Sequence, residues 1–557
     1  MPNPVAVNDL SPISGSLQTS RISYGVETAG KNYGQAYNST TWYSDIPQNG
    51  SQYTIISDNY TANYYVSRSN AGGAYVEGGL PAVDEYSAPV FWLTAGTSSL
   101  DIITIVNGLP DRIGQVPFNS GSQALNWIIS SSNYFAVGPP YEQIDADNLG
   151  LYINGGQIIS YPTTMSAWYD ISGQNNRFTL TNGPTYNSNG WINFDGSDDY
   201  AVAVNTTLPS NATSSFTLMA VARTSGGGAY QTVLGTGGLF SQIGFISNNA
   251  FMYGRNGGGG GLLYSNGGAI TTGRFYHLTM TYNGSTATAY LNGVATQTGV
   301  NIGSNGGTNG VHVLSTYTPS AASEILTGDI AEAYVYTQAI SASDVAQNYY
   351  GGPIVSSSLL AAYDAGNLVS YPKSGTSTYN LTGSGTGTLT NGVGYNNIYG
   401  GTFNFDGVDD FINLGQINYT SVTVEGWVFR DDTTDLVNIV SGTGVVQYFG
   451  VYSQTLAYYA STNTGTWTFG TTTLQPQTWY HAALTYDDSN YSVKMYLNGN
   501  LESTSTADAS YRTGYVSTLG TYNNASIRFW KGYISNLRIY GTALTQAQIQ
   551  QNYNATK

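Results

Sequence analysis

Residues 193–201 read NFDGSDDYA and residues 404–412 read NFDGVDDFI, so one acidic nine-residue stretch occurs twice in this 557-residue chain. Three further blocks recur around it in the same order, pairing residues 149–162 with 359–372, 275–293 with 479–499, and 328–349 with 532–553. Self-similarity of this kind is the signature of a duplicated structural unit. The sequence therefore predicts two copies of one domain after a distinct N-terminal region.

Inside the repeated segments, the residue pattern is typical of strands joined by tight turns. Residues 216–223 and 422–429 alternate side chains between two faces, which is the period of a strand. The residues expected on the inner faces are Phe216, Leu218, Ala220 and Ala222 in one copy, and Val422, Val424, Gly426 and Val428 in the other. Residues 291–293 and 497–499 each read Leu-Asn-Gly, and Asn-Gly favours a hairpin turn. Many short strands with Gly-rich turns predict a β-sandwich or jelly roll.

Each copy ends in a sequence that predicts a short helix. A Ser or Thr followed three residues later by an acid or amide has the spacing of a capping box, and apolar residues on either side fit a hydrophobic staple. The pairs are Ser341 with Asp344, Thr545 with Gln548, Ile340 with Val345, and Leu544 with Ile549. We interpret both helices as structural elements that close the sandwiches.

Taken together, these blocks resemble laminin-G-like, concanavalin-A-like domains. The resemblance is carried by Trp-Tyr-Asp-Ile-Ser-Gly at 168–173, the Phe-Asp-Gly-x-Asp-Asp stretches, aromatic-Tyr-His, Tyr-Leu-Asn-Gly and the closing helix ending in Gln-Asn-Tyr. It covers about residues 145–352 and 355–557, although residues 378–383 depart from the Trp-Tyr-Asp pattern. It implies two jelly-roll sandwiches that bind glycans or proteins, or that serve as structural modules. A fold alone does not fix which of these applies.

The predicted organisation is mainly β and has three parts. Residues 1–142 form a small α+β anchoring domain, 143–352 the first sandwich (copy 1) and 355–557 the second (copy 2), with a short hinge at 351–353. In the N-terminal part, strand-like runs occur at 53–56 and 89–93, helix-like runs at about 101–107 and 122–130, and a loop at 109–118. This pattern resembles N-terminal segments of structural proteins of large tailed phages.

Composition excludes several classes of partner. The chain carries only 9% charged residues and a net charge of −16, without a cluster of Lys and Arg. Because phosphate binding needs such clusters, we expect no nucleic-acid partner and no anionic membrane surface. No apolar run is long enough for a transmembrane helix, and residues 1–5 lack the features of a signal peptide. Cysteine is absent, which suits a protein that folds in a reducing cytosol and works outside it, as a phage particle does.

We also predict that the chain is not an enzyme. Its three histidines are His277, His312 and His481, and the first and last are repeat equivalents within strand patterns, without a GxSxG elbow. We interpret them as packed structural residues. Glucanases of this fold take their paired carboxylates from a Glu-x-Asp-x-Glu string, which this sequence lacks. The isolated glutamates of the two copies are Glu324, Glu332, Glu425 and Glu502.

Two clusters of aspartates are candidate calcium ligands, since calcium takes six to eight oxygen ligands. They are Asp195, Asp198 and Asp199 in copy 1, and Asp406, Asp409 and Asp410 in copy 2. The alternative is that they fix a hairpin by accepting backbone hydrogen bonds, as Asx turns do. We favour the turn and keep calcium open; no other cofactor is predicted.

Aromatic residues are the other candidates for a binding site. Trp427 and Phe429 lie opposite the predicted inner face of their strand, where copy 1 has Val221 and Arg223. Their rings are suited to stacking on sugars, but in a two-sheet sandwich such residues more often belong to a core. We therefore predict that both are packed.

These observations favour a virion protein of a tailed phage, such as a fibre, decoration or appendage, that displays two lectin-like sandwiches for host glycan attachment. The expected partners are other virion proteins and a host glycan, and we expect a homo-oligomer because Tyr is enriched at interfaces and the chain holds 48 of them. The alternatives are a free-standing secreted or surface adhesin, and a glycan-degrading enzyme, which lacks its carboxylate pair.

Overall fold

The computed structural model describes most of the chain from residue 144 to residue 556 and, before that, the backbone of six strands. Short gaps within this range fall at residues 145–146, 157–159, 162–165, 171, 173–175, 205–207, 209–213, 237–240, 248–249, 255–264, 303–310, 318–322, 397–399, 434–435, 460–466, 508–512 and 523–526. Within the described part, strands dominate and are paired antiparallel throughout.

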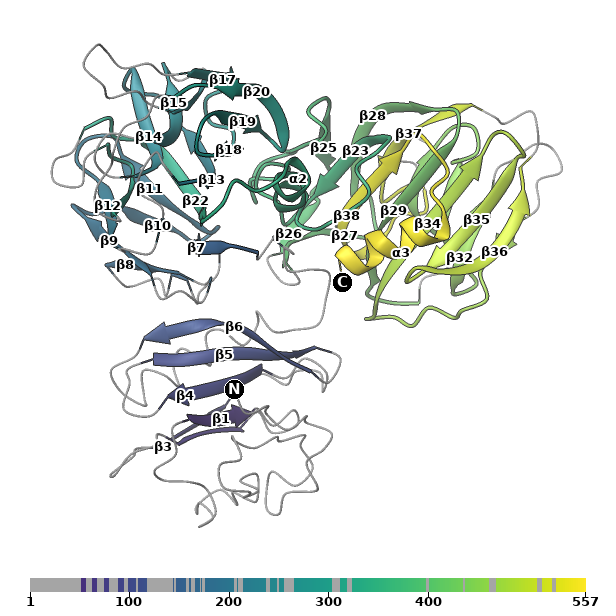
Figure 1. Cartoon of the computed structure of the whole chain (residues 1–557). Coiled ribbons are helices and arrows are strands. Elements are labelled where there is room, and N and C mark those ends of the chain that lie inside the picture. The colour runs from purple at the N-terminus through teal and green to yellow at the C-terminus, as the bar shows by residue number, and fades with distance from the viewer. Residues whose placement is uncertain are drawn as a thin grey trace.

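Copy 1 is built from two eight-stranded sheets (Figure 1). The first sheet runs in the order β10 (Thr185–Asn187), β11 (Trp191–Asp195), β22 (Thr327–Tyr336), β13 (Phe216–Thr224), β18 (Tyr276–Tyr282), β19 (Ala287–Leu291) and β20 (Val294–Val300), and β7 (Leu149–Asn154) also pairs with β22. The second sheet runs in the order β17 (Ser265–Ala269), β16 (Ala250–Tyr253), β15 (Gln242–Ile246), β14 (Tyr230–Thr236), β21 (Val311–Leu314), β12 (Tyr200–Val204), β9 (Arg177–Thr181) and β8 (Ala167–Tyr169).

Copy 2 repeats this topology strand for strand. Its first sheet contains β26 (Gly394–Asn396), β27 (Thr402–Asp406), β38 (Lys531–Tyr540), β29 (Val422–Arg430), β34 (Trp479–Asp487), β35 (Ser492–Leu497) and β36 (Asn500–Thr506), with β23 (Leu359–Asp364) beside β38. Its second sheet contains β33 (Thr468–Phe469), β32 (Thr455–Tyr459), β31 (Tyr448–Tyr452), β30 (Val437–Gly442), β37 (Gly514–Leu519), β28 (Phe411–Tyr419), β25 (Thr386–Thr390) and β24 (Ser377–Tyr379). The predicted duplication and sandwich fold are confirmed.

The alternation of apolar residues builds both cores. Phe216, Leu218, Ala220 and Ala222 lie in one buried cluster, and Val422 and Val424 lie in the corresponding cluster of copy 2. Both Asn-Gly turns adopt positive φ, at 52° and 75° for Asn292 and Gly293. Such angles are easily reached only by Gly and Asn, which explains why this dipeptide stands there in both copies.

The two closing helices begin as predicted. They are α2 (Ala342–Tyr350) and α3 (Gln546–Ala555), and each has a complete capping box. The staple residues of each helix lie together in one buried cluster. Among the helices in the described part of the chain, none is long and apolar enough to cross a membrane.

The N-terminal region contains strands where the sequence predicted a helix and a loop. The sheet β1 (Gln52–Ile56), β4 (Pro89–Thr94), β5 (Ser99–Val106) and β6 (Leu109–Pro117) confirms the two strand-like runs; β2 (Asn63–Ser67) and β3 (Tyr75–Gly79) form a hairpin. The helix expected at 101–107 was wrong, because its β-branched Ile, Thr and Val residues favour β5. The loop expected at 109–118 was also wrong, because its residues pair with β5. The helix expected at 122–130 lies outside the described residues.

The two sandwiches pack directly against each other, with α2 between them (Figure 1). One apolar cluster joins Trp191, Val221, Phe275, Ala331 and Tyr349 of copy 1 to Ala362, Leu368, Val369 and Leu381 of copy 2. The Tyr349 hydroxyl donates a 2.7 Å hydrogen bond to the Leu381 carbonyl, which secures the contact.

The linker between the copies is tied to both helices. The Gly352 amide donates to Gln347 in α2 at 2.9 Å, and the Gln551 side chain in α3 donates to the Pro353 carbonyl at 2.8 Å. A Cβ at Gly352 would lie 2.3 Å from the Ala555 oxygen, so only glycine fits there. The structure thus has a packed linker where the sequence predicted a hinge at residues 351–353.

Candidate functional site

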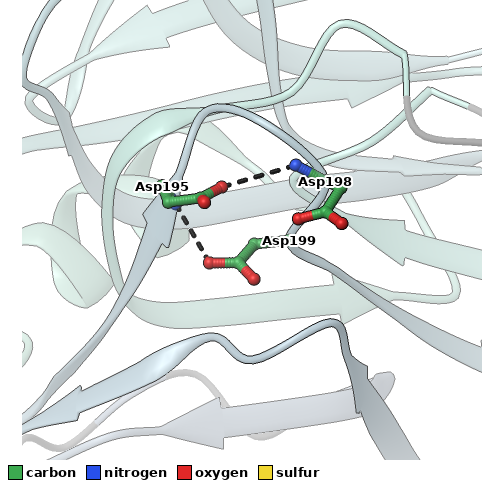
Figure 2. Close-up of side chains that lie close together, drawn as sticks. All are labelled: Asp195, Asp198 and Asp199. Atoms are coloured by element: carbon green, nitrogen blue, oxygen red, sulfur yellow. Dashed lines mark hydrogen bonds between the residues drawn. The ribbon is translucent and has the colours of Figure 1, made fainter.

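The predicted aspartate clusters form in both copies. In copy 1, the carboxylate oxygens of Asp195, Asp198 and Asp199 lie within 4.8 Å of one another at the turn between β11 and β12 (Figure 2). Asp195 Oδ1 accepts hydrogen bonds from the Ser197 amide at 2.8 Å and the Asp198 amide at 3.4 Å, while Asp199 Oδ2 accepts from the Asp195 amide at 3.1 Å. The carboxylates of Asp195 and Asp199 therefore stabilise the turn that carries them, which is the Asx role that we favoured.

Copy 2 reproduces this turn with Asp406, Asp409 and Asp410. Asp406 Oδ1 accepts the Val408 amide at 2.7 Å, and Asp410 Oδ2 accepts the Asp406 amide at 3.0 Å. The other oxygen, Asp410 Oδ1, is buried without a hydrogen-bond partner.

Hydrogen bonding and burial shift the pKa values of three of these aspartates. In copy 1 the hydrogen bond from the Ser197 backbone lowers the pKa of Asp195, whereas burial raises the pKa of Asp199. Burial likewise raises the pKa of Asp410 in copy 2. These clusters could hold a cation by their three oxygens, because hard cations take carboxylate ligands, but the turn hydrogen bonds already account for their geometry. Calcium binding stays a prediction.

The two repeat-equivalent histidines are packed, as predicted. His277 and His481 are buried on β18 and β34, and burial lowers the pKa of both imidazoles to about 3. They are therefore neutral at physiological pH. Each lies against the tyrosine of its closing helix, Tyr349 or Tyr553, with ring centroids 5.7 and 5.9 Å apart. His312 is buried on β21 of the other sheet, away from this contact.

Each isolated glutamate has a partner in the local packing. Glu332 accepts hydrogen bonds from Tyr334 and Asn154, and the Gln242 side chain donates to Glu324 at 3.1 Å. Glu502 accepts four hydrogen bonds, which come from the amides and hydroxyls of two threonines in the loop after β33.

Glu425 belongs to a buried polar group beneath α3. Its carboxylate lies 3.6 Å from Arg538 Nη1 and 3.8 Å from His481 Nε2, and the Asn552 side chain donates to it at 2.8 Å. Burial raises the pKa of Glu425 to about 7, although Arg538 opposes the shift. This group links the helix to the sheet rather than facing a cleft.

Trp427 and Phe429, the two aromatic candidates, are packed as predicted. Their exposed fractions are 6% and 9%. Trp427 Nε1 donates a 2.9 Å hydrogen bond to Thr556, and the Phe429 ring packs 5.3 Å from that of Trp479. Neither ring is therefore available as an open sugar platform.

A different set of aromatic residues forms a half-exposed surface on copy 2, which we call the Trp467 cluster. It lies on the outer face of the second sheet and comprises Tyr452, Tyr459, Trp467, Phe469, Tyr522 and Arg528, with the fully buried Tyr448 at its base. The Trp467 ring lies 4.8–4.9 Å from the rings of Tyr448, Tyr452 and Tyr459. Phe469, at its edge, is 40% exposed.

Sequence reasoning missed this cluster because it compared the repeated blocks, and the cluster lies between them. The signal that could have found it is the alternation in β31, where Phe449 and Val451 enter the core, and Tyr448 and Tyr452 lie on the opposite face of the strand. An outward row of aromatic residues on a sandwich strand is not required by the core, so it is a reason to suspect binding.

Copy 1 has a polar network at the corresponding place. Gln242 stands where copy 2 has Tyr448, and its side chain accepts a hydrogen bond from Thr232 at 3.0 Å and donates to Glu324 at 3.1 Å. Glu324 occupies the position of Arg528, and both have positive φ, 54° and 62°. The carbonyls of these two residues accept equivalent backbone hydrogen bonds from β14 and β30.

The chain matches the family model of the concanavalin A-like lectin/glucanases superfamily twice, over residues 194–346 and 406–550, which is more than half of its length. A comparison with curated protein sequences found no match.

Among solved structures, similar chains include domain 4 of AbnA, a GH43 extracellular arabinanase from Geobacillus stearothermophilus, in complex with arabinotriose (20% identity, 35% of this chain and 98% of that one, TM-score 0.28). The binding domain of botulinum neurotoxin serotype D is 11% identical over 72% of this chain and 98% of its own, with a TM-score of 0.32. A heptameric SAP-like pentraxin from Limulus polyphemus is 14% identical over 24% and 69%, with a TM-score of 0.20.

Proposed function

The chain belongs to the concanavalin A-like lectin/glucanases superfamily, and from this premise we propose that it is a non-enzymatic glycan-binding protein whose second sandwich binds saccharides on the Trp467 cluster. The half-exposed rings of that cluster are the observation that carries the proposal. Aromatic residues offer large, rigid apolar area that gains free energy when the C–H face of a sugar ring covers it. Copy 1 has polar side chains at the corresponding place and is not expected to bind in this way.

The absence of catalysis is part of the proposal. A retaining glycosidase needs two carboxylates about 5 Å apart, facing the substrate. In this chain, Glu332 and Glu425 are buried and hydrogen-bonded, and Glu502 accepts hydrogen bonds from two threonines. We expect no hydrolysis of common polysaccharides; turnover that is abolished by changing one Asp or Glu would refute this.

A glycan titration of the full chain tests binding. Phe469→Ala removes the most exposed ring of the cluster and is expected to weaken saccharide affinity about threefold to tenfold. Tyr230→Ala removes a comparably exposed aromatic residue from copy 1 and serves as the matched control, with unchanged affinity expected. Equal effects of the two substitutions, or no saccharide binding at all, would reject the proposed site.

The proposed setting is the virion of a tailed phage, with the chain as a fibre, decoration or appendage component and the N-terminal region as its anchor. The absence of cysteine, the low content of charged residues and the two tandem sandwiches support this setting. Mass spectrometry of purified particles should detect the chain, and light scattering should show the full chain as an oligomer. A monomer that is absent from particles would favour the alternative, a free-standing lectin-like adhesin.

A further inference from the structure

Arg528 gives the Trp467 cluster a positive charge within its aromatic surface. The centre of its guanidinium lies 4.4 Å from the ring centroid of Tyr522, 5.4 Å from that of Tyr448 and 5.9 Å from that of Trp467. These distances are typical of cation–π contacts. Cation–π contacts do not use the N–H groups of arginine as a carboxylate would, so a guanidinium held among rings keeps N–H donors for another acceptor.

No carboxylate pairs with Arg528 within the part of the chain that the structure describes. The chain as a whole is acidic, with 32 acidic and 16 basic residues. Arg223 pairs with Asp329, and Arg538 lies against Glu425. A half-exposed arginine beside open rings, in a chain rich in acids that do not approach it, has an electrostatic preference for an anion from outside.

The comparison with copy 1 shows that the fold itself does not require a positive charge at the position of Arg528. Glu324 holds the equivalent backbone position, with the same positive φ and an equivalent backbone hydrogen bond. Its carboxylate is bound by Gln242 Nε2 at 3.1 Å within a closed polar network. Because both charges are compatible with the turn, the fold does not require arginine there. Rings and arginine occur together in copy 2, and both are replaced in copy 1.

We propose that the Trp467 cluster selects saccharides that carry a carboxylate, such as uronic or sialic acids. The apolar face of a sugar ring would lie on the aromatic residues, and the carboxylate would accept hydrogen bonds from the guanidinium edge of Arg528. Arginine binds carboxylates with two parallel N–H donors, which gives direction as well as strength. This inference rests on the proposed glycan-binding function and adds the chemical class of the ligand.

The experiment uses the full chain and two matched ligand pairs, oligogalacturonate with its methyl ester and sialyllactose with its methyl ester. In each pair the acid and the neutral partner differ in one feature, the carboxylate. Isothermal titration at low salt is expected to show tighter binding of at least one acid than of its neutral partner. Arg528→Gln should weaken binding of that acid about tenfold and binding of the neutral partner much less. Arg528→Glu, which installs the charge of copy 1, should weaken the acid further.

The variants and ligands separate the outcomes. Retained binding of the neutral partner shows that the cluster is intact in the arginine variants, and Phe469→Ala should weaken both ligands of a pair. If acid and neutral ligands bind equally and Arg528→Gln changes neither, the inference is overturned while the glycan-binding function stands. If none of the four saccharides binds, both are overturned. Binding of a protein partner that is lost in Phe469→Ala, without saccharide binding, would likewise overturn both.

Discussion

Met219 in copy 1 and Glu425 in copy 2 occupy the same position on equivalent strands, and both lie beneath the closing helix of their sandwich. The helix contributes an asparagine in each case: Asn348 Nδ2 contacts the Met219 sulfur at 3.6 Å, and Asn552 Nδ2 donates to Glu425 at 2.8 Å. Both asparagines also donate to the hydroxyl of a sheet tyrosine, at 2.7 and 2.9 Å. The hydrogen bond from the helix asparagine to the sheet tyrosine is therefore preserved in both copies. The residue beside this hydrogen bond is the apolar Met219 in copy 1 and the ionisable Glu425 in copy 2.

The outer faces of the second sheets differ in the same way. Gln242 and Glu324 form part of a polar network in copy 1, whereas Tyr448 and Arg528 contact each other within the Trp467 cluster in copy 2. Identical topology with different outer faces teaches that the duplicated fold constrains turns, caps and core, and leaves the faces free to diverge. Ligand specificity is therefore to be sought where the copies differ.

The largest effect on stability is expected when the buried pair of copy 2, Glu425 and Arg538, loses one partner. Arg538→Tyr alone leaves Glu425 without its cation and is expected to lower the free energy of unfolding by about 3–5 kcal/mol. The double substitution Glu425→Met with Arg538→Tyr reproduces Met219 and Tyr334 of copy 1, and should recover most of that loss. Urea denaturation of the full chain measures both. A double variant as unstable as the single one would show that the surroundings of copy 2 require the ionic pair.

Glu425 of copy 2, which copy 1 replaces by Met219, should make the stability of the chain depend on pH. Because the folded pKa of Glu425 is raised from 4.5 to about 7, the protonated form is favoured by folding. This contribution is fully present below pH 4.5 and is lost as the pH rises through 7, at a cost of at most about 3 kcal/mol. Glu425→Gln should remove that loss, so the variant should gain stability relative to wild type between pH 5 and pH 8. Parallel curves for the two proteins would contradict the raised pKa.

The sequence was sufficient to predict features that both copies need for folding. The alternation around Phe216 and Val422, the Asn-Gly turns and the capping boxes are local patterns with local causes, and the structure confirms each. The helix predicted at 101–107 was wrong, because the Ile, Thr and Val residues of this segment favour strands. The segment forms part of β5.

The candidate site was harder to predict, because it depends on residues brought together from separate strands. Trp467 and Arg528 are distant in sequence, and they meet because the strands from β37 through β30, β31 and β32 to β33 are consecutive in the second sheet. Trp427 and Phe429 attracted attention as sequence neighbours, yet packing on the first sheet buries them. Repeat comparison finds what the copies share, and this site lies where they differ.

Both copies contain the aspartate turn, so substitution of its aspartates should destabilise the two copies equally. Asp195→Ala and Asp406→Ala each remove the acceptor of two backbone amides and should destabilise the chain by about 1–2 kcal/mol. If the carboxylates act only in the turn, the loss is the same with EDTA and with millimolar calcium. A loss that appears only in calcium would instead establish the cation site, and a calcium effect in one copy would break the equivalence of the turns.

The smallest expected difference concerns the capping boxes, where copy 1 uses Asp344 and copy 2 uses Gln548. Asp344 Oδ2 accepts the Ser341 amide at 2.9 Å, and Gln548 Oε1 accepts the Thr545 amide at 2.9 Å, so the hydrogen bonds match. Only the aspartate adds a negative charge near the positive end of the helix dipole, which contributes about 0.3–1 kcal/mol.

Asp344→Ala should therefore destabilise the chain by about 1 kcal/mol and Gln548→Ala by about half as much. Asp344→Asn keeps an acceptor oxygen without the charge, and it should bring copy 1 to the level of copy 2. Denaturation at low and high salt provides the check, because salt screens the charge–dipole term and leaves the hydrogen bond. The difference between the two alanine variants should shrink at high salt; a difference that salt does not change would assign it to hydrogen-bond geometry instead of charge.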